Sequence, residues 1–102
     1  MVNELILQNA NRFADYLSTF SFVDEVLLFG SQVTGNVHSE SDIDICIVCH
    51  GFEYVNYNSE WTLKKSKIDT RIHIVPVSKE IEANMNFYNE NKNSSIVLFK
   101  RK

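Results

Sequence analysis

Apolar positions along the chain predict a helix followed by two buried strands. Residues 3–20 carry large apolar side chains at helical spacing, with Asn3 placed as an N-cap, so we expect an amphipathic helix. The run at residues 23–29 is mostly apolar and is followed by a glycine, which favours a strand buried on both faces. Residues 42–48 begin with strict alternation and become uniformly apolar, so this strand should have a charged face only at its start.

A third strand is predicted at residues 68–75, where apolar and polar residues alternate. Isoleucines occupy one face of this strand, and Asp69, Arg71 and His73 occupy the other. We expect His73 to be half-buried and hydrogen-bonded at that face. Pro76 cannot donate a backbone hydrogen bond to a central ladder, so the strand should end there or lie at an edge of the sheet.

The remaining segments complete a small mixed sheet. Residues 52–66 suit either a short helix or a hairpin. Ser78 has the position of an N-cap for a second long helix, and residues 96–99 suit a final short strand. This order of elements indicates an α/β (α+β) fold, a small mixed β-sheet with helices packed on it, formed as one domain by residues 1–102.

The charge of the chain argues against one class of partner. The 102 residues carry a net charge of -3 and give a pI near 5.5. Such a chain lacks the basic face with which proteins hold nucleic-acid phosphates, so direct nucleic-acid binding is not expected. One basic cluster, Lys64, Lys65 and Lys67, is typical of a solvated loop or helix face. A contact for a nucleotide phosphate or an acidic partner is the alternative.

The cysteines and the hydropathy of the chain indicate the cellular compartment in which the protein is expected. Cys46 and Cys49 spell a C-x-x-C motif, but positions three apart on a strand point to opposite faces. We therefore expect two buried, reduced thiols rather than a disulfide or a metal site. No apolar run approaches the roughly 20 residues that span a bilayer, and the start of the chain lacks the features of a signal peptide. These features predict a cytoplasmic protein with no membrane association.

Two aspartates stand at the start of the second apolar strand. Asp42 and Asp44 are two residues apart, so both side chains should leave the same face, with backbones about 6.6 Å apart. Like charges about 4 Å apart repel by roughly 4 kcal/mol at an effective dielectric constant of 20, and a divalent cation relieves this repulsion. Carboxylate oxygens are the ligands that Mg²⁺ prefers. With Asp69 as a third carboxylate, the group can hold two metal ions, as in phosphoryl or nucleotidyl transfer.

A turn with two glycines comes just before these aspartates. Residues 29–44 read FGSQVTGNVHSESDID. Backbone N–H groups and the Ser31 hydroxyl are expected to point outward there, and Gly30 has no Cβ to obstruct a phosphate. Gly35 lets the chain reverse closely. The turn and the D-x-D pair are each weak signals, but together, joining two apolar strands, they indicate a nucleotide site with much higher specificity.

These residues resemble a known signature. Gly30-Ser31, Gly35 and the SDIDI run at 41–45 resemble the signature of the DNA polymerase beta-like nucleotidyltransferase superfamily, and the short chain is similar to its minimal nucleotidyltransferases. The resemblance implies a nucleotidyltransferase fold and an enzyme that transfers a nucleoside monophosphate from ATP, or from another NTP, to a hydroxyl acceptor. It assigns Gly30 and Ser31 to the triphosphate. It assigns Asp42, Asp44 and Asp69 to catalysis, as ligands of two Mg²⁺ ions.

Two positions depart from the pattern of this superfamily. Gln32 follows Gly-Ser where many relatives carry an arginine. The third acid is not marked by a local motif, and Asp69 is the residue we expect. The alternative is that the equivalent point in the strand is position 73, which is a histidine in this chain. In that case the set of three carboxylates would be incomplete.

The resemblance also implies a partner. A chain of 102 residues leaves no room for the acceptor-binding domain of larger relatives, so we expect the acceptor on a second copy or a different protein. Minimal nucleotidyltransferases commonly pair with a HEPN-type toxin, which implies an antitoxin that transfers AMP to a tyrosine of its partner. A weakly active or inactive binding subunit that acts by complex formation is the alternative. An antibiotic-modifying enzyme is a third hypothesis, disfavoured by the missing acceptor domain.

Overall fold

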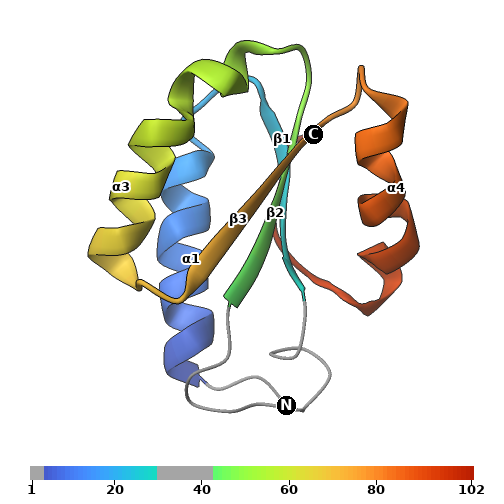
Figure 1. The fold of residues 1–102 in the computed structure, drawn as a ribbon. Coiled ribbons are helices and arrows are strands. Elements are labelled where there is room, and N and C mark those ends of the chain that lie inside the picture. Colours follow the sequence, from blue (N-terminus) through green and yellow to red (C-terminus); the bar gives the residue numbers. More distant parts are fainter. Residues whose placement is uncertain (1–3, 30–42) are drawn as a thin grey trace.

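The computed structural model of the chain describes residues 4–29 and 43–102. In this part, four strands form one sheet in the order β3-β2-β1-β4 (Figure 1). The strands are β1 (Val23–Phe29), β2 (Ile43–Cys49), β3 (Ile72–Ser78) and β4 (Ile96–Lys100). β1 runs antiparallel to both β2 and β4, whereas β2 and β3 are parallel. The predicted small mixed sheet is therefore confirmed.

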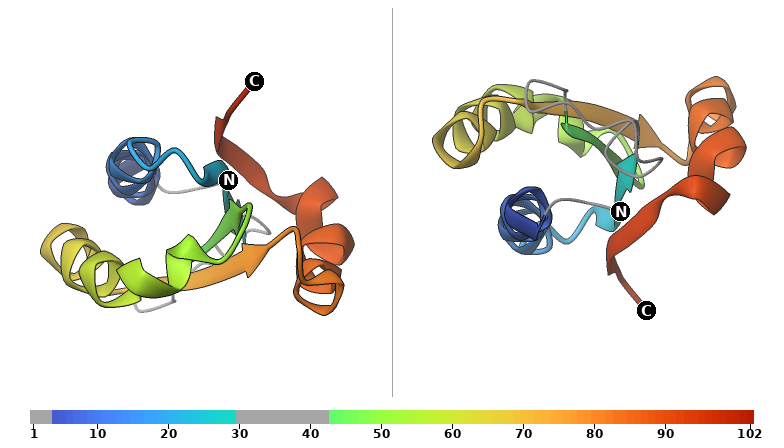
Figure 2. Two further views of the ribbon diagram at one scale, coloured as in Figure 1. Left: turned by 90° about the horizontal axis from the view of Figure 1, so that it is seen from above. Right: turned by 90° about the horizontal axis from the view of Figure 1, so that it is seen from below.

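Three α-helices of the described residues cover the two faces of this sheet. α1 (Glu4–Leu17) and α3 (Asn58–Ile68) lie on one face, and α4 (Glu82–Asn91) lies on the other (Figure 1 and Figure 2). Short 3-10 helices, η1 (Glu53–Tyr57) and η2 (Lys92–Ser94), precede α3 and β4. η1 and α3 form the crossover between β2 and β3, because a tight hairpin cannot join parallel neighbours. No helix in this described part is long and apolar enough to cross a membrane.

Each face of the sheet has its own apolar cluster. The larger one lies under α1 and α3, and α1 contributes residues three or four positions apart, Ile6, Ala10, Phe13, Ala14 and Leu17. The smaller one lies under α4 and contains Leu27, Phe29, Cys46, Val48 and Val77, against Met85 and Tyr88. β2 sends alternate side chains into the two clusters, which explains why its sequence is an almost unbroken apolar run.

The two cysteines of β2 belong to opposite faces, as predicted. Cys46 packs in the cluster under α4, and Cys49 packs in the cluster under α1 and α3. Both thiols are free and buried. Burial raises the pKa of each thiol to about 12, so both are neutral at physiological pH. The expectation of two buried, reduced cysteines is confirmed.

Three predicted element boundaries are wrong: the helix predicted over residues 3–20 ends at Leu17, and two other elements start later than expected. The strand predicted from residue 68 begins only at Ile72, because α3 continues to Ile68 and a turn follows it. The helix predicted to start at Ser78 starts at Glu82, and Ser78 is the last residue of β3. The Ser78 hydroxyl donates to the Gly51 carbonyl oxygen at 2.7 Å instead of capping a helix.

Three further expectations are confirmed. Residues 52–66 form helix rather than a hairpin, since they hold η1 and most of α3. Pro76 lies in β3, which is an edge strand, and the structure therefore tolerates its missing N–H. The final strand predicted at residues 96–99 is present as β4.

The end of β4 is held against the segment that joins α1 to β1. The Arg101 guanidinium donates to the carbonyl oxygens of Ser18 and Phe20, each at 3.0 Å, and of Val23 at 3.1 Å. A planar guanidinium with five N–H donors can satisfy three such acceptors at once. Arg101 thus fixes the second edge strand to the turn that leads into a central strand.

Trp61 is the largest fully buried side chain and anchors α3 to the core. Its ring centroid lies 5.7 Å from that of Phe20 and 6.0 Å from that of Phe22. Within the described residues, its indole Nε1 has no hydrogen-bond partner. Trp61 therefore stabilises the fold through apolar packing, while its buried N–H costs free energy.

Replacing Trp61 should separate these two contributions. We expect Trp61→Ala to lower the free energy of unfolding by ~3–5 kcal/mol, because a large cavity is created. Trp61→Phe should cost clearly less, since it keeps an aromatic ring and removes the unpaired N–H. Urea denaturation followed by circular dichroism measures both, because the chain has one tryptophan and loses its fluorescence probe. Leu63→Ala, at a position on the same helix that is 60% exposed, should change stability little. Equal losses for both Trp61 variants would contradict this account.

Candidate functional site

Asp44 is a predicted site residue that lies on a central strand of the sheet. It is the second residue of β2 and is half-buried. Its neighbours Ile43 and Ile45 are fully buried in the core under α1 and α3. Side chains alternate along a strand, so Asp44 faces the side of the sheet that carries α4. The carboxylate therefore stands at the start of a central strand, on the less covered face.

His73 lies beside Asp44 on the neighbouring strand. β2 and β3 are parallel, and their register pairs Asp44 directly with His73. Ile72 and Ile74 pack on the core under α1 and α3, so His73 between them also faces the α4 side. Its side chain is exposed, and the prediction of a half-buried histidine is wrong. The pairing of β2 with β3 therefore places the Asp44 carboxylate and the His73 imidazole at neighbouring positions on the same face of the sheet.

Asp69 is placed differently from the prediction. It ends α3, where its backbone N–H donates to the Lys65 carbonyl oxygen at 2.8 Å, and it is not part of β3. Its carboxylate accepts hydrogen bonds from Arg71 Nε at 3.0 Å and Arg71 Nη2 at 2.7 Å. The backbone N–H of Arg71 donates at 3.0 Å, and Asn9 Nδ2 of α1 donates at 3.1 Å. Asp69 therefore points toward α1, and its role as the third catalytic acid stays a prediction.

The same contacts set the charge of Asp69. Side-chain hydrogen bonds from Arg71 lower the pKa of this carboxyl to about 2, and the bonds from the Arg71 backbone and Asn9 add to that effect. Its side chain is 8% exposed, so the carboxylate is largely shielded from solvent. Asp69 is a structural anion that joins α1, the end of α3 and the start of β3.

Several predicted residues lie outside the described part of the structure. Gly30, Ser31, Gly35 and Asp42 fall in the range 30–42, and their assignments stay predictions. Within residues 4–29 and 43–102, no group of three or more His, Cys, Asp or Glu side chains is placed to hold a metal ion. A metal held at Asp44 would therefore need Asp42 or bound water to complete its coordination.

An aromatic pair flanks Asp44 on the side away from His73. Phe29 is the partner of Asp44 across the antiparallel β1–β2 ladder. The ring of Phe29 contacts that of Phe87 on α4, with centroids 5.2 Å apart and a T-shaped arrangement. Phe87 is 42% exposed and offers an apolar face to a nucleobase or an aromatic acceptor. No local sequence pattern indicates this pair, because the contact between the two rings depends on how α4 packs on the sheet.

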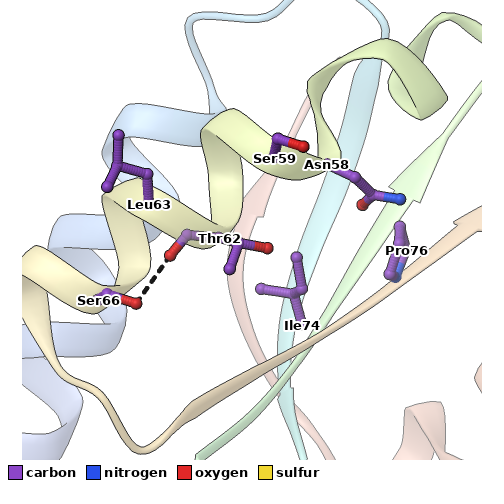
Figure 3. Close-up of a pocket in the computed structure, with 7 residues that line it drawn as sticks. All are labelled: Asn58, Ser59, Thr62, Leu63, Ser66, Ile74 and Pro76. Carbon is purple, nitrogen blue, oxygen red and sulfur yellow. Dashed lines mark hydrogen bonds between the residues drawn. The ribbon is translucent and has the colours of Figure 1, made fainter.

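A groove runs along the outer edge of the sheet, between α3 and β3 (Figure 3). It has a volume of about 710 Å³ and combines apolar with hydroxyl and amide side chains. Its lining residues are Asn58, Ser59, Thr62, Leu63, Ser66, Ile74 and Pro76. The groove does not include Asp44, so it is a neighbouring surface rather than part of the carboxylate site.

The lysine cluster lies on α3, as the prediction of a solvated helix face requires. Lys67 is exposed, and the Lys64 ammonium lies over the Tyr16 ring, 5.1 Å from its centroid. Lys65 lines a second hollow of about 340 Å³ together with Arg71 and His73. Lys64 therefore packs on α1, whereas Lys65 lies at a hollow that also contains two other basic side chains.

The chain belongs to the polymerase beta nucleotidyltransferase family. The family profile described as "Polymerase beta, Nucleotidyltransferase" matches residues 11–102. This range contains β1, β2 and β3, and with them Asp44, Asp69 and His73. No curated protein matched the chain by sequence.

Solved structures share this fold. A candidate nucleotidyltransferase from Sulfolobus solfataricus superposes with a TM-score of 0.61 at 23% identity, over 94% of this chain and 81% of that chain. A toxin–antitoxin structure solved with AMP-PNP gives a TM-score of 0.61 at 18% identity, over 92% of this chain and 74% of that chain. At these identities the similarity is one of fold.

Because the Asp69 carboxylate is charged in the folded state, we expect the wild type and Asp69→Asn to differ in stability by an amount that depends on pH. Asp69→Asn should lower the free energy of unfolding by about 2 kcal/mol at neutral pH. The folded-state pKa lies below the unfolded value of about 3.9, so the stabilisation is fully present above that value. It disappears as the pH falls toward the folded-state pKa of about 2.

The measurement is urea denaturation of the wild type and the variant between about pH 7 and pH 2. The difference between them should stay constant down to about pH 5 and then shrink. Asp15→Asn replaces an exposed carboxylate of α1 and serves as the control with a small effect at every pH. A difference that does not change with pH would mean that the charge of Asp69 is not what stabilises the fold.

Proposed function

We propose that this protein is a metal-dependent nucleotidyltransferase that transfers AMP from ATP to a hydroxyl group of a partner protein. The observation that carries the proposal is the position of Asp44. A half-buried carboxylate stands at the start of a central strand in a chain of the polymerase beta nucleotidyltransferase family. Family membership supports a transferase fold, and the carboxylate supplies the type of ligand that such chemistry uses.

The proposed roles follow from the chemistry of each residue. Asp44, with Asp42, would hold Mg²⁺, which when bound neutralises charge on the phosphate oxygens. Gly30 and Ser31 would bind the triphosphate through backbone N–H groups and a hydroxyl. Phe29 and Phe87 lie beside Asp44, where they would exclude water and offer an apolar surface to the nucleobase.

The proposed partner is a HEPN-type toxin that carries the acceptor tyrosine, with this chain as its antitoxin. The toxin–antitoxin structure solved with AMP-PNP, which shares the fold of this chain, supports that choice. A second copy of the chain is the other source of an acceptor hydroxyl. In either case the modified residue would approach the α4 side of the sheet, because Asp44 faces that side.

A second candidate function is favoured by one observation. The carboxylate of Asp69 is engaged with Arg71 and Asn9 rather than placed beside Asp44 as a third acid. A protein with an incomplete set of acids could act as a binding subunit that neutralises its partner without turnover. The two candidate functions differ in whether AMP is transferred from ATP to the partner protein.

The direct test uses ATP labelled at the α-phosphate, Mg²⁺ and the purified product of the adjacent gene as acceptor. Wild-type protein should label the acceptor, and Asp44→Asn should reduce the rate at least about 100-fold, because a direct metal ligand is lost. Asp15→Asn, far from the site on an exposed face of α1, should keep the wild-type rate. Tight binding of the acceptor without labelling would favour the binding subunit. Labelling that survives Asp44→Asn would contradict the proposed site.

Nucleotide binding should also be visible in thermal stability. A ligand at 100 times its dissociation constant stabilises the native state by about 2.7 kcal/mol, which raises the Tm of a domain of this size by about 10 °C. ATP with Mg²⁺ should therefore raise the Tm of the wild type and leave that of Asp44→Asn almost unchanged. Differential scanning fluorimetry measures both. An unchanged wild-type Tm at saturating nucleotide would argue against a nucleotide site.

A further inference from the structure

Strand pairing, rather than proximity in sequence, selects the side chain that stands next to Asp44. Directly paired residues of parallel strands leave the same face, and neighbouring strands are about 4.8 Å apart. The residue paired with Asp44 on β3 is His73. Its imidazole is exposed on that face and lies outside both apolar clusters, so core packing does not account for it.

Asp69 is held in an arrangement that opposes metal binding. Its carboxylate accepts hydrogen bonds from Arg71 and from Asn9 of α1. To reach a metal at Asp44 it would have to give up its ion pair with Arg71, whose side chain is only 29% exposed. Breaking such a partly buried pair is costly. His73 needs no such rearrangement.

The donor set at this position is therefore a carboxylate and an imidazole. Mg²⁺ prefers oxygen ligands, whereas imidazole nitrogen suits the later first-row divalent metals. We propose that His73 is a ligand of the site metal, and that the site consequently favours a first-row transition-metal ion over Mg²⁺. This inference rests on the proposed function, because it assumes that a metal binds at Asp44.

The alternative is that His73 is an ordinary polar residue on an edge strand, where such residues discourage pairing with other chains. Any polar side chain would serve that purpose, and metal preference would not depend on it. The two explanations differ in what happens to selectivity when the nitrogen donor is replaced. His73 is exposed, so its variants are expected to fold, and circular dichroism checks this.

The test measures Co²⁺ and Mg²⁺ affinity by calorimetry, in the same buffer and at the same pH for every variant. His73→Asp replaces the nitrogen with an oxygen donor and should lower the Co²⁺/Mg²⁺ affinity ratio about 10-fold or more. His73→Ala should weaken Co²⁺ binding and alter the visible absorption spectrum of bound Co²⁺, because one nitrogen ligand is lost. His50→Ala is the control at an exposed histidine that follows the last residue of β2, at the opposite end of the strand from Asp44, where the imidazole bonds to Asp24.

The outcomes separate this inference from the proposed function. A ratio and a Co²⁺ spectrum that stay unchanged in both His73 variants, while Asp44→Asn loses metal, would overturn the His73 assignment and leave the proposed site intact. Failure of the wild type to bind either ion, with or without ATP, would overturn both. A fall in the ratio for His73→Asp with no change for His50→Ala is the expected result.

Discussion

The parallel pairing of β2 with β3 is the constraint on which the candidate site depends. Seven consecutive pairs, from Ile43 with Ile72 to Cys49 with Ser78, fix the register of these strands. A slip of one residue would turn every β3 side chain to the opposite face, and the isoleucines that fill the core would be exposed. The apolar core therefore determines which polar side chain stands next to Asp44. The geometry of the site follows from packing on the far side of the same sheet.

Much of the fold follows from local sequence, because burial on both faces leaves a clear signal. The runs that form β1 and β2 are almost wholly apolar, and α1 shows its inner face by spacing alone. The start of β3 is where the prediction from local sequence is wrong. Residues 68–71 alternate like a strand, yet they form a helix end and a turn, since the Asp69 side chain finds partners on Arg71 and Asn9. Alternation over a few residues cannot distinguish these structures, because the deciding contact with Asn9 comes from a distant helix.

The residues of the candidate site differ in the same way, since some features could be predicted from local sequence and others could not. The position of Asp44 at the start of a buried strand was predictable from the apolar run that follows it, whereas its role as a metal ligand stays a prediction. The placement of His73 beside it was not predictable, because register is a property of two strands and is absent from either one alone. Phe87 was likewise beyond local sequence, since its contact with Phe29 depends on how α4 packs on the sheet. Asp69 was expected on a strand but follows α3 instead, and its role as the third acid stays a prediction.

The pairing of β1 with β4 has a consequence for how the chain folds. β1 is a central strand, yet one of its two neighbours comes from the far end of the sequence, with Leu28 paired to Ile96 and Arg101 bound to the Val23 carbonyl oxygen. Such non-local pairing is slow, because a long loop must close before any contact rewards it. Until β4 arrives, one edge of β1 presents unpaired backbone groups beside an apolar surface, which is the kind of edge that recruits other chains. Folding intermediates of this protein are thus most vulnerable to aggregation at a strand that is central and buried in the native sheet.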